Sequence, residues 1–323
     1  ENLKKQGYLD DINIIICNVG SRKIGEQDDY ASSSWGYFAP NLTIYGFDAD
    51  ADACDAANQD LAARNINWKE IHVPLALADK AGEMPLYVTK HPMCSSLYPP
   101  NEELLARFAG LPELVNLDFE VEIETTTLDD FCEEEKIERI DFLQVDVQGA
   151  DLAVLKGGQK ILNSVSLIQI EVEFSELYKG QPLFAQVDQY LRERGFILMD
   201  LQLARRSRAL SPVVSNKHPG QPLWGEAFYI RDRVSDSGKA CNLNELFKLA
   251  CIADAGDFID YALEILVILT IQSSKEGEYN FSDLILESLV KKANVKLSDL
   301  KKHRIYSEIV EFASDKCIEL LDV

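Results

Sequence analysis

The chain has 323 residues, enough for one large α/β domain together with a smaller one. Its 54 Asp and Glu residues outnumber 32 Lys and Arg residues, which gives a formal net charge of −22. Binding to a phosphate backbone needs a concentrated basic face, so this composition disfavours nucleic acid as a partner. A cationic ligand is tolerated better.

Cysteine usage and hydropathy indicate the class of protein. The seven cysteines are scattered and form no CxxC pair, so neither a zinc ribbon nor a redox motif is supported. The longest strongly apolar run, 263–271, is too short to span a bilayer and contains Glu264. No signal peptide is recognisable, and Glu1 rather than Met stands first, so we expect the native start to lie upstream. We therefore expect a cytoplasmic protein with reduced thiols that does not bind membranes.

The first 200 residues alternate short apolar strands with helical segments. Strands are predicted at 12–17, 43–47, 70–77, 84–89, 119–124, 140–145 and 167–174. Helices are predicted at 50–64, 101–110, 127–135, 150–162 and 184–194. This alternation predicts a doubly wound, mostly parallel sheet with helices on both faces. Two late strands, 196–203 and 227–230, have no obvious helix between them and are expected to pair antiparallel.

The character of the chain changes around 236–240, and only helical periodicity follows. Helices are predicted at 243–253, 257–272, 281–293 and 303–321. We therefore expect two domains, a sheet domain over 1–235 and a helical extension over 236–323. The extension is expected to cap the sheet domain or to form a contact between copies of the chain.

The stretch IDFLQVDVQG, residues 140–149, holds the first candidate for chemistry. An apolar strand leads into Asp146, Gln148 and a glycine, and ligands of open parallel sheets bind beyond the carboxyl ends of the strands. Asp146 is therefore expected to face a crevice, although a cap or turn role would also explain it. Acids at 171 and 173 occupy alternate positions of a strand that should be buried, which suggests a polar pocket or a solvated strand end.

Two further candidates follow the first two strands. In NVGSRKIG, Gly20 and Gly25 are spaced as in a P-loop, but Glu26 and Gln27 stand where Lys and Ser or Thr are needed. GxGxxG is absent as well, so Gly20 indicates either close approach of a ligand or simply a tight turn. Asp48 ends the second strand, where an acid can bind ribose hydroxyls or cap the next helix.

The histidines give no metal site. His72, His91, His218 and His303 lie far apart in the sequence, and no two share a ligand spacing. Each is expected to be a surface or loop residue, and His91 and His218 lie in loops that could reach the crevice. We therefore expect no metal.

The run TTLDDFCEEEKIERIDFLQVDVQGADLAVLKGG, residues 126–158, resembles the signature block of the FkbM-family methyltransferases, which use S-adenosylmethionine. The similarity continues through LIQIEVEFSELYKGQPLFAQVDQYLRERGF and includes shorter motifs at 45–50, 73–79, 95–100 and 223–231. It covers residues 12–231 and not the helical tail. The resemblance implies a class I methyltransferase, Rossmann-like fold: a mostly parallel seven-stranded sheet whose last strand is antiparallel.

The resemblance also implies roles for single residues. The expected cofactor-binding residues are the first loop (Asn18, Gly20, Ser21), the ribose site (Asp48, Ala49), the adenine site (Ala76, Leu77, with Asp79 nearby) and Asp146, which faces the sulfonium and the acceptor. The chain departs from the family pattern in the first loop. Asn18 stands where the family usually has Asp, and the second glycine is displaced to Gly25.

These assignments predict O-methylation of a small hydroxylated acceptor, such as a sugar or a natural-product intermediate, with S-adenosylhomocysteine as product. A hydroxyl acceptor loses its proton as it attacks, and Asp146, Glu171 and His91 are the candidate bases. The alternative is a catalytically inactive, methyltransferase-like binding or scaffold module, which the altered first loop would suit. A nicotinamide-dependent dehydrogenase is disfavoured by the missing GxGxxG.

Overall fold

The chain is organised into two compact units, described here from a computed structural model. The structure describes residues 2–22, 30, 33–211, 213–234, 242–273, 279–292, 297–315 and 317–318. The sheet unit contains residues 13–32 and 38–232, and the helical unit contains residues 1–12, 33–37 and 233–323.

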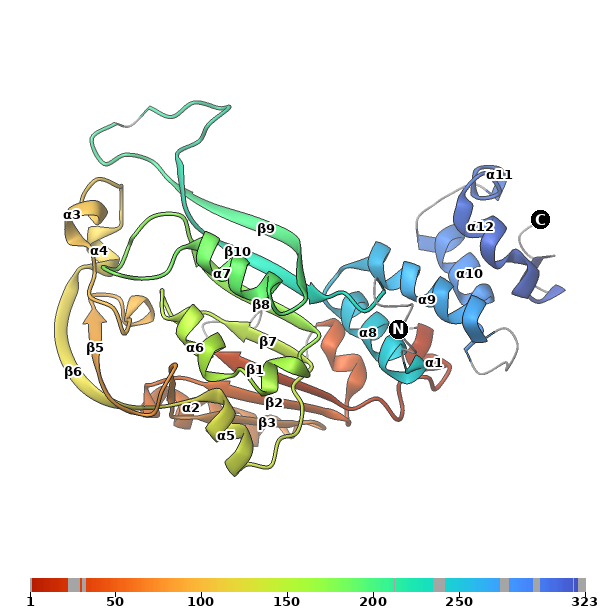
Figure 1. The fold of residues 1–323 in the computed structure, drawn as a ribbon, viewed down its shortest axis with the longest axis horizontal. Coiled ribbons are helices and arrows are strands. Elements are labelled where there is room, and N and C mark those ends of the chain that lie inside the picture. Colours follow the sequence, from red (N-terminus) through yellow and green to blue (C-terminus); the bar gives the residue numbers. More distant parts are fainter. Residues whose placement is uncertain are drawn as a thin grey trace. The chain divides into compact units, whose positions relative to one another are not determined.

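The sheet unit is built on seven strands in the order β3-β2-β1-β7-β8-β10-β9 (Figure 1). Their bounds are β1 Ile14–Val19, β2 Leu42–Phe47, β3 Lys69–Val73, β7 Phe142–Val145, β8 Leu167–Glu173, β9 Phe196–Arg206 and β10 Gln221–Arg231. The first five strands in that order pair in parallel, and β10 pairs antiparallel with both β8 and β9. This confirms the predicted class I methyltransferase fold, including the antiparallel pairing of the two late strands.

The strand order reverses at β1, which has β2 on one side and β7 on the other. In open α/β sheets, the crevice beyond the strand ends at such a reversal is where ligands bind. The register is aligned here, because Val19 at the end of β1 pairs with Phe47 of β2 and with Val145 of β7. The residues that follow these three strands therefore begin side by side at the same edge of the sheet.

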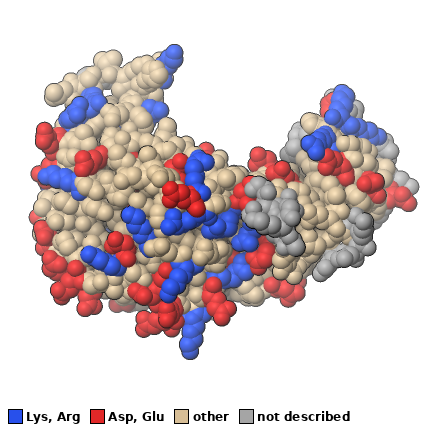
Figure 2. Space-filling view, in the orientation of Figure 1, with Lys and Arg blue, Asp and Glu red and all other residues tan. Residues whose placement is uncertain are grey.

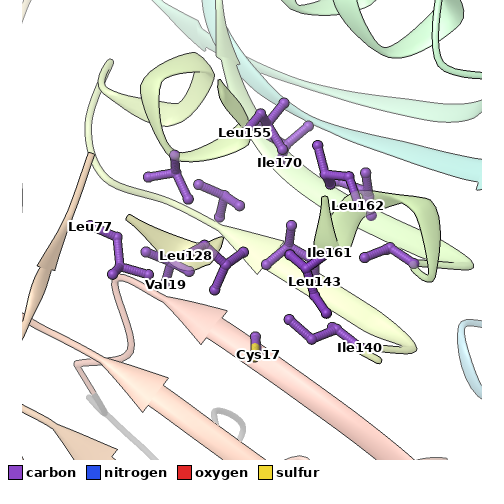
Figure 3. Close-up of a cluster of buried hydrophobic side chains, with 14 of the residues drawn as sticks. Cys17, Val19, Leu77, Leu128, Ile140, Leu143, Leu155, Ile161, Leu162 and Ile170 are labelled. Carbon is purple, nitrogen blue, oxygen red and sulfur yellow. The ribbon is translucent and has the colours of Figure 1, made fainter. Parts of the chain in front are cut away.

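One face of the sheet is covered by α5 (Leu128–Glu134), α6 (Asp151–Gly157) and α7 (Phe184–Arg192). Figure 3 shows the core under α5 and α6, where Leu128 lies beside Val19 of β1 and Leu155 lies beside Ile170 of β8. Each of these four side chains is at most 1% exposed. Burial of an aliphatic side chain of this size contributes about 1.5–3 kcal/mol, so this face fixes the strand positions beneath the crevice.

The segment after β3 leaves the main sheet and starts a second one. The sequence predicted a single strand over 70–77, but β3 ends at Val73 and β4 (Ala76–Leu77) begins after a break. Pro74 has no N–H to donate to the ladder, and Leu75 instead donates to the carbonyl of Val73 at 2.9 Å. The second sheet has the order β4-β6-β5, with β5 spanning Gly82–Thr89 and β6 spanning Leu117–Thr126.

The remaining helices of the sheet unit are short except for α2. Their bounds are α2 Ala51–Arg64, η4 Pro92–Cys94, α3 Glu102–Leu105, α4 Pro112–Val115 and η5 Ile161–Asn163. The predicted helix over 101–110 thus ends at Leu105, and the one over 150–162 is divided between α6 and η5. The 3-10 turn η3, Ser34–Phe38, precedes β2 in the chain and belongs, except for Phe38, to the helical unit.

The helical unit combines the two ends of the described chain. Its helices are α1 Asn2–Lys5, α8 Leu243–Ala255, α9 Ile259–Ser273, α10 Ser282–Lys292, α11 Leu297–Leu300, α12 Arg304–Ile309 and the turn η6 Val310–Phe312. Tyr8 packs on Phe281 and Phe247 with ring centroids 5.1 and 6.1 Å apart. Residues 1–12 therefore pack in this unit, whereas the sequence pattern grouped them with the sheet. Among the described helices, none has both the length and the apolar character needed to cross a membrane.

Candidate functional site

A cavity of about 570 Å³ opens beyond the carboxyl ends of β1, β2 and β7. The residues that directly follow these strands, Gly20, Asp48 and Asp146, all line it. The opposite wall is formed by β5, β6 and the loop over 89–97. All of its lining residues belong to the sheet unit. The cavity therefore lies at the strand reversal, where the sequence predicted a crevice.

Gly20 lets the first loop pass close against the end of β7. It has a φ of +87°, and a Cβ added there would lie 1.9 Å from the carbonyl oxygen of Asp146. The N–H groups of Gly20 and Ser21 both donate to the carbonyl of Phe47, at 2.9 and 2.8 Å. Close backbone packing therefore requires this glycine. Gly25, the second glycine of the loop, lies outside the described residues.

Ser21 does not line the cavity. Its side chain is buried, and Oγ lies 3.1 Å from Nδ1 of His72, on β3. The other ring nitrogen of His72 lies 3.2 Å from the Glu70 carboxylate. His72 is therefore a buried residue of the sheet and not the surface or loop residue that the sequence predicted. The Ser21 hydroxyl is directed away from any ligand in the cavity.

Asp48 faces the cavity, and the neighbouring Asp50 caps the following helix. The Asp50 carboxylate accepts a hydrogen bond from the Ala53 N–H at 3.1 Å, which makes Asp50 the N-cap of α2. Asp48 Oδ1 accepts from the Asp50 N–H at 2.8 Å, and its Oδ2 lies 3.7 Å from Nε of Arg22. Arg22 also pairs with Asp50. Sequence reasoning missed Arg22, because a lone arginine in a loop carries no motif.

The other expected cofactor residues divide into two groups. Ala49, Ala76 and Leu77 line the cavity beside Asp48. Asp79 is exposed and does not line it, so the structure does not bring Asp79 to the site. Asn18 does not line it either, but its Oδ1 is buried and has no hydrogen-bond partner in the part of the chain that the structure describes.

Asp146 and Glu171 are joined by the side-chain amide of Gln148. Its Nε2 donates to Asp146 Oδ1 at 2.6 Å and to Glu171 Oε2 at 2.8 Å. Gln148 has a φ of +54°, which is uncommon outside glycine, and it is held from two sides. The Tyr178 hydroxyl, which lies 2.7 Å from the carbonyl oxygen of Cys94, is also 3.2 Å from Oε1, and the Ser96 hydroxyl donates to the backbone carbonyl at 2.6 Å. The amide is therefore positioned before any ligand arrives.

The carboxyl groups near Gln148 form a cluster with unusual proton affinity. Asp146 has surface exposed in the open cavity, yet burial of the carboxyl among protein atoms raises its pKa. Burial, together with the neighbouring acids, raises the pKa of Asp151 to about 7 and that of Glu171 and Glu173 well above the usual range. Adjacent carboxyls resist joint ionisation, so a proton held on Glu171 allows the neighbouring Asp146 to ionise.

His91 is separate from this cluster. Its side chain is exposed and does not line the cavity, although Lys90 and Pro92 on either side do. Its backbone N–H donates to the carbonyl of Leu114 at 2.9 Å, and the residue precedes the turn η4. The structure thus brings Asp146 and Glu171 together, as predicted, and leaves His91 outside. Among the described residues, no group of three or more His, Cys, Asp or Glu side chains could hold a metal ion.

Comparison with known proteins gives one curated relative and several solved structures. The chain is 43% identical over 75 residues to 2-O-methyltransferase NoeI of Sinorhizobium fredii (strain NBRC 101917 / NGR234). That match covers 23% of this chain and 31% of NoeI, so the chain spans about a third of this relative's length. 

Two solved structures are similar at low identity. Methyltransferase FkbM from Methylobacillus flagellatus KT is 12% identical, with a TM-score of 0.37 over 68% of this chain and 43% of that one. TrmK of M. capricolum, in complex with S-adenosyl-homocysteine, is 8% identical, with a TM-score of 0.33 over 80% of this chain and 96% of that one. Because these TM-scores are low, the fold assignment rests on the strand order and not on them.

The family comparison identifies the family of the chain. The model of the methyltransferase FkbM domain matches residues 23–198, which is more than half of the chain. The matched span contains β2, β7 and β8, and with them Asp48, Asp146 and Glu171. The chain belongs to the FkbM methyltransferase domain family.

Proposed function

We propose that the chain transfers a methyl group from S-adenosylmethionine to a hydroxyl of a small acceptor, such as a sugar or a natural-product intermediate. The observation that carries this proposal is the meeting of Gly20, Asp48 and Asp146 in one cavity, each one residue beyond an aligned strand end. Membership of the FkbM family supports methyl transfer. The short match to a protein named 2-O-methyltransferase supports oxygen as the acceptor atom.

The residues at the strand ends fit this cofactor. The Asp48 carboxylate can accept hydrogen bonds from ribose hydroxyls, and Ala76 and Leu77 offer an apolar surface to adenine. When bound, the cofactor supplies an electrophilic methyl group on a positively charged sulfur, and the acids around the cavity attract such a cation.

We assign to Asp146 the role of the base that takes the proton from the hydroxyl group of the methyl acceptor. Gln148 holds the Asp146 carboxylate by a 2.6 Å hydrogen bond, and Glu171 lies behind the same amide. A positioned base contributes about 10²–10⁴-fold to such a reaction, and alignment of the acceptor up to roughly 7–11 kcal/mol. Asp146 therefore receives the proton of the acceptor hydroxyl, and Gln148 fixes where that happens.

The proposal extends to partners and location. We predict that the chain acts on a small molecule and binds neither nucleic acid nor membranes. We also predict a cytoplasmic location and a contact between copies of the chain through the C-terminal helices. The acidic composition supports the absence of a nucleic-acid partner.

The test is transfer of a labelled methyl group from S-adenosylmethionine to a panel of hydroxylated compounds and cell extracts. We expect label in the wild-type product and roughly 10²-fold or greater loss in Asp146→Asn, with binding of S-adenosylhomocysteine retained. Transfer at wild-type rate by Asp146→Asn would remove the base assignment. Tight cofactor binding without transfer to any extract would favour the binding or scaffold module instead.

A further inference from the structure

The cavity has two halves of different chemistry. The half at the strand ends carries Asp48, Ala76 and Leu77, which the proposed function assigns to the cofactor. The other half is formed by β5, β6 and the loop over 89–97, and it has no role so far. Asp146 and Gln148 lie where the two halves meet. The second half is therefore where the acceptor would bind.

The second half presents an apolar face of a two-stranded ribbon. Leu86 and Val88 of β5 and Phe119, Val121 and Ile123 of β6 all line the cavity. They are cross-strand neighbours, because Leu86 pairs with Val121 and Val88 pairs with Phe119. Phe119 is 53% exposed and Val121 is 42% exposed, so this face is open to solvent.

The outer face of β6 is acidic. Glu120, Glu122 and Glu124 alternate with the apolar residues and are exposed. Figure 2 shows acidic side chains along the edge of the molecule where β6 lies in Figure 1. Successive side chains of a strand point to opposite faces, so residues two apart share one face. β6 therefore has the pattern of a strand whose outer face is solvated and whose inner face contacts an apolar group.

The loop over 89–97 adds apolar surface, and its hydroxyl groups already have backbone partners. Thr89 donates to the carbonyl of His91 at 2.7 Å, and Ser95 accepts from the Thr89 N–H at 3.3 Å. Ser96 donates to the carbonyl of Gln148 at 2.6 Å. Pro92, Met93 and Leu97 of this loop line the cavity with apolar surface, and the charged groups on this side are Lys90 of the same loop and Asp118 of β6.

We propose that this half of the cavity binds the apolar body of the acceptor, which is a hydroxylated molecule with an extended apolar portion. The apolar portion lies on the face formed by Leu86, Val88, Phe119, Val121 and Ile123, and a hydroxyl at its end reaches Asp146. This inference rests on the proposed function and narrows it, because it predicts that acceptors with an apolar group bind more tightly than small sugars that lack one. Burial of the apolar portion supplies the affinity, and Asp146 selects the hydroxyl.

The test compares two ligands that share a sugar and differ in the apolar group, n-octyl β-glucoside below its micelle concentration and methyl β-glucoside. Binding of each to the protein saturated with S-adenosylhomocysteine is measured by calorimetry and saturation-transfer NMR. We expect octyl glucoside to bind roughly tenfold or more tightly than methyl glucoside. Equal affinity, or a preference for methyl glucoside, would overturn the inference.

Variants on the two faces of β6 give a matched comparison. Phe119→Ser should weaken octyl glucoside binding roughly tenfold, and Val121→Thr should weaken it less. Glu120→Gln, on the outer face of the same strand, should leave it unchanged. All three should bind S-adenosylhomocysteine like the wild type, which shows that they are folded. An unchanged octyl glucoside affinity in both Phe119→Ser and Val121→Thr contradicts the inference.

Failure of this inference can be told apart from failure of the proposed function. Binding of S-adenosylhomocysteine without a preference for octyl glucoside overturns only the assignment of the apolar half. Absence of S-adenosylhomocysteine binding to the wild type overturns the proposed function, and the acceptor assignment falls with it.

Discussion

The Ser21 hydroxyl and the imidazole of His72 form a buried hydrogen bond, with Oγ 3.1 Å from Nδ1. The Glu70 carboxylate lies 3.2 Å from the other ring nitrogen, and Trp68 donates to the same carboxylate at 2.8 Å. A carboxylate only accepts, so Nε2 of His72 donates to it, and in the neutral imidazole Nδ1 then accepts from the Ser21 hydroxyl. Gly46 makes room for the pair, because a Cβ there would lie 2.5 Å from Nδ1. This hydrogen bond holds the first loop against β3, and neither of the two residues lines the cavity.

Ser21→Ala should therefore reduce stability and leave ligand binding nearly unchanged. The variant leaves Nδ1 of His72 buried without its partner, which costs about 1–3 kcal/mol of unfolding free energy. Affinity for S-adenosylhomocysteine should change by less than about threefold, since the hydroxyl does not face the cavity. Urea unfolding and calorimetry measure the two quantities, with Ser211→Ala on the surface as control. A tenfold loss of affinity at unchanged stability would place the hydroxyl at the ligand instead.

Gly20→Ala should disrupt the first loop. The added Cβ would overlap the carbonyl oxygen of Asp146, and the φ of +87° disfavours any side chain. Gly110→Ala is the matched control, because it has a φ of +79° and no atom within 4 Å of the added Cβ. We expect Gly110→Ala to lose about 1 kcal/mol of stability and keep wild-type affinity for S-adenosylhomocysteine. Gly20→Ala should lose more stability and at least tenfold in affinity; similar behaviour of the two variants would show that the close approach to Asp146 is unimportant.

Asp48→Asn should weaken binding of S-adenosylhomocysteine by roughly tenfold or more, because hydrogen bonds to a charged group contribute about 1.5–3 kcal/mol. The variant keeps the shape of the side chain and its contact with the Asp50 N–H. Asp52→Asn removes an equal charge from the first turn of α2, where the residue is exposed and does not line the cavity. Calorimetric titration of both variants distinguishes a specific contact from general attraction. Equal losses in the two would argue against a ribose contact.

Asp151 should make the protein less stable as the pH rises. Its carboxylate accepts from the N–H groups of Val147 and Gly149 at 3.0 and 2.9 Å, yet burial raises its pKa from 3.8 to about 7. Between these two pH values the folded chain holds a proton that the unfolded chain has released, so each rise in pH favours unfolding. The slope from this group approaches roughly 1.4 kcal/mol per pH unit.

Urea unfolding at a series of pH values tests this expectation. Asp151→Asn should flatten the dependence between pH 4 and 7, whereas Asp188→Asn on α7, which is outside the carboxyl cluster, should not. An identical slope in the wild type and Asp151→Asn would show that another group causes the dependence.

Local patterns predicted most of the sheet unit. β2 begins one residue before the predicted 43–47, and α2 begins one residue after the predicted start of 50–64. The apolar runs are long enough and the turn residues distinct enough to locate these elements. The prediction was wrong where a single residue interrupts an apolar run, as Pro74 does in the predicted strand over 70–77.

Tertiary contacts account for what the sequence could not give. Asp146 was predicted because it follows a strand, and Glu171 because it is an acid within a strand expected to be buried. Nothing in the sequence indicates that Gln148 joins them or that Tyr178 lies beside Gln148. His72 looks like a surface histidine until β3 places it beside Ser21. The packing of Tyr8 against the C-terminal helices is likewise invisible, because the partners lie more than 200 residues apart.

The most direct test of the account is calorimetric titration of the wild-type protein with S-adenosylhomocysteine and, in parallel, with NAD. We expect saturable one-to-one binding of S-adenosylhomocysteine and no binding of NAD, because the cavity places Asp48 beside Gly20 and Asp146 in a chain without GxGxxG. The absence of saturable S-adenosylhomocysteine binding, or saturable binding of NAD in its place, would contradict it.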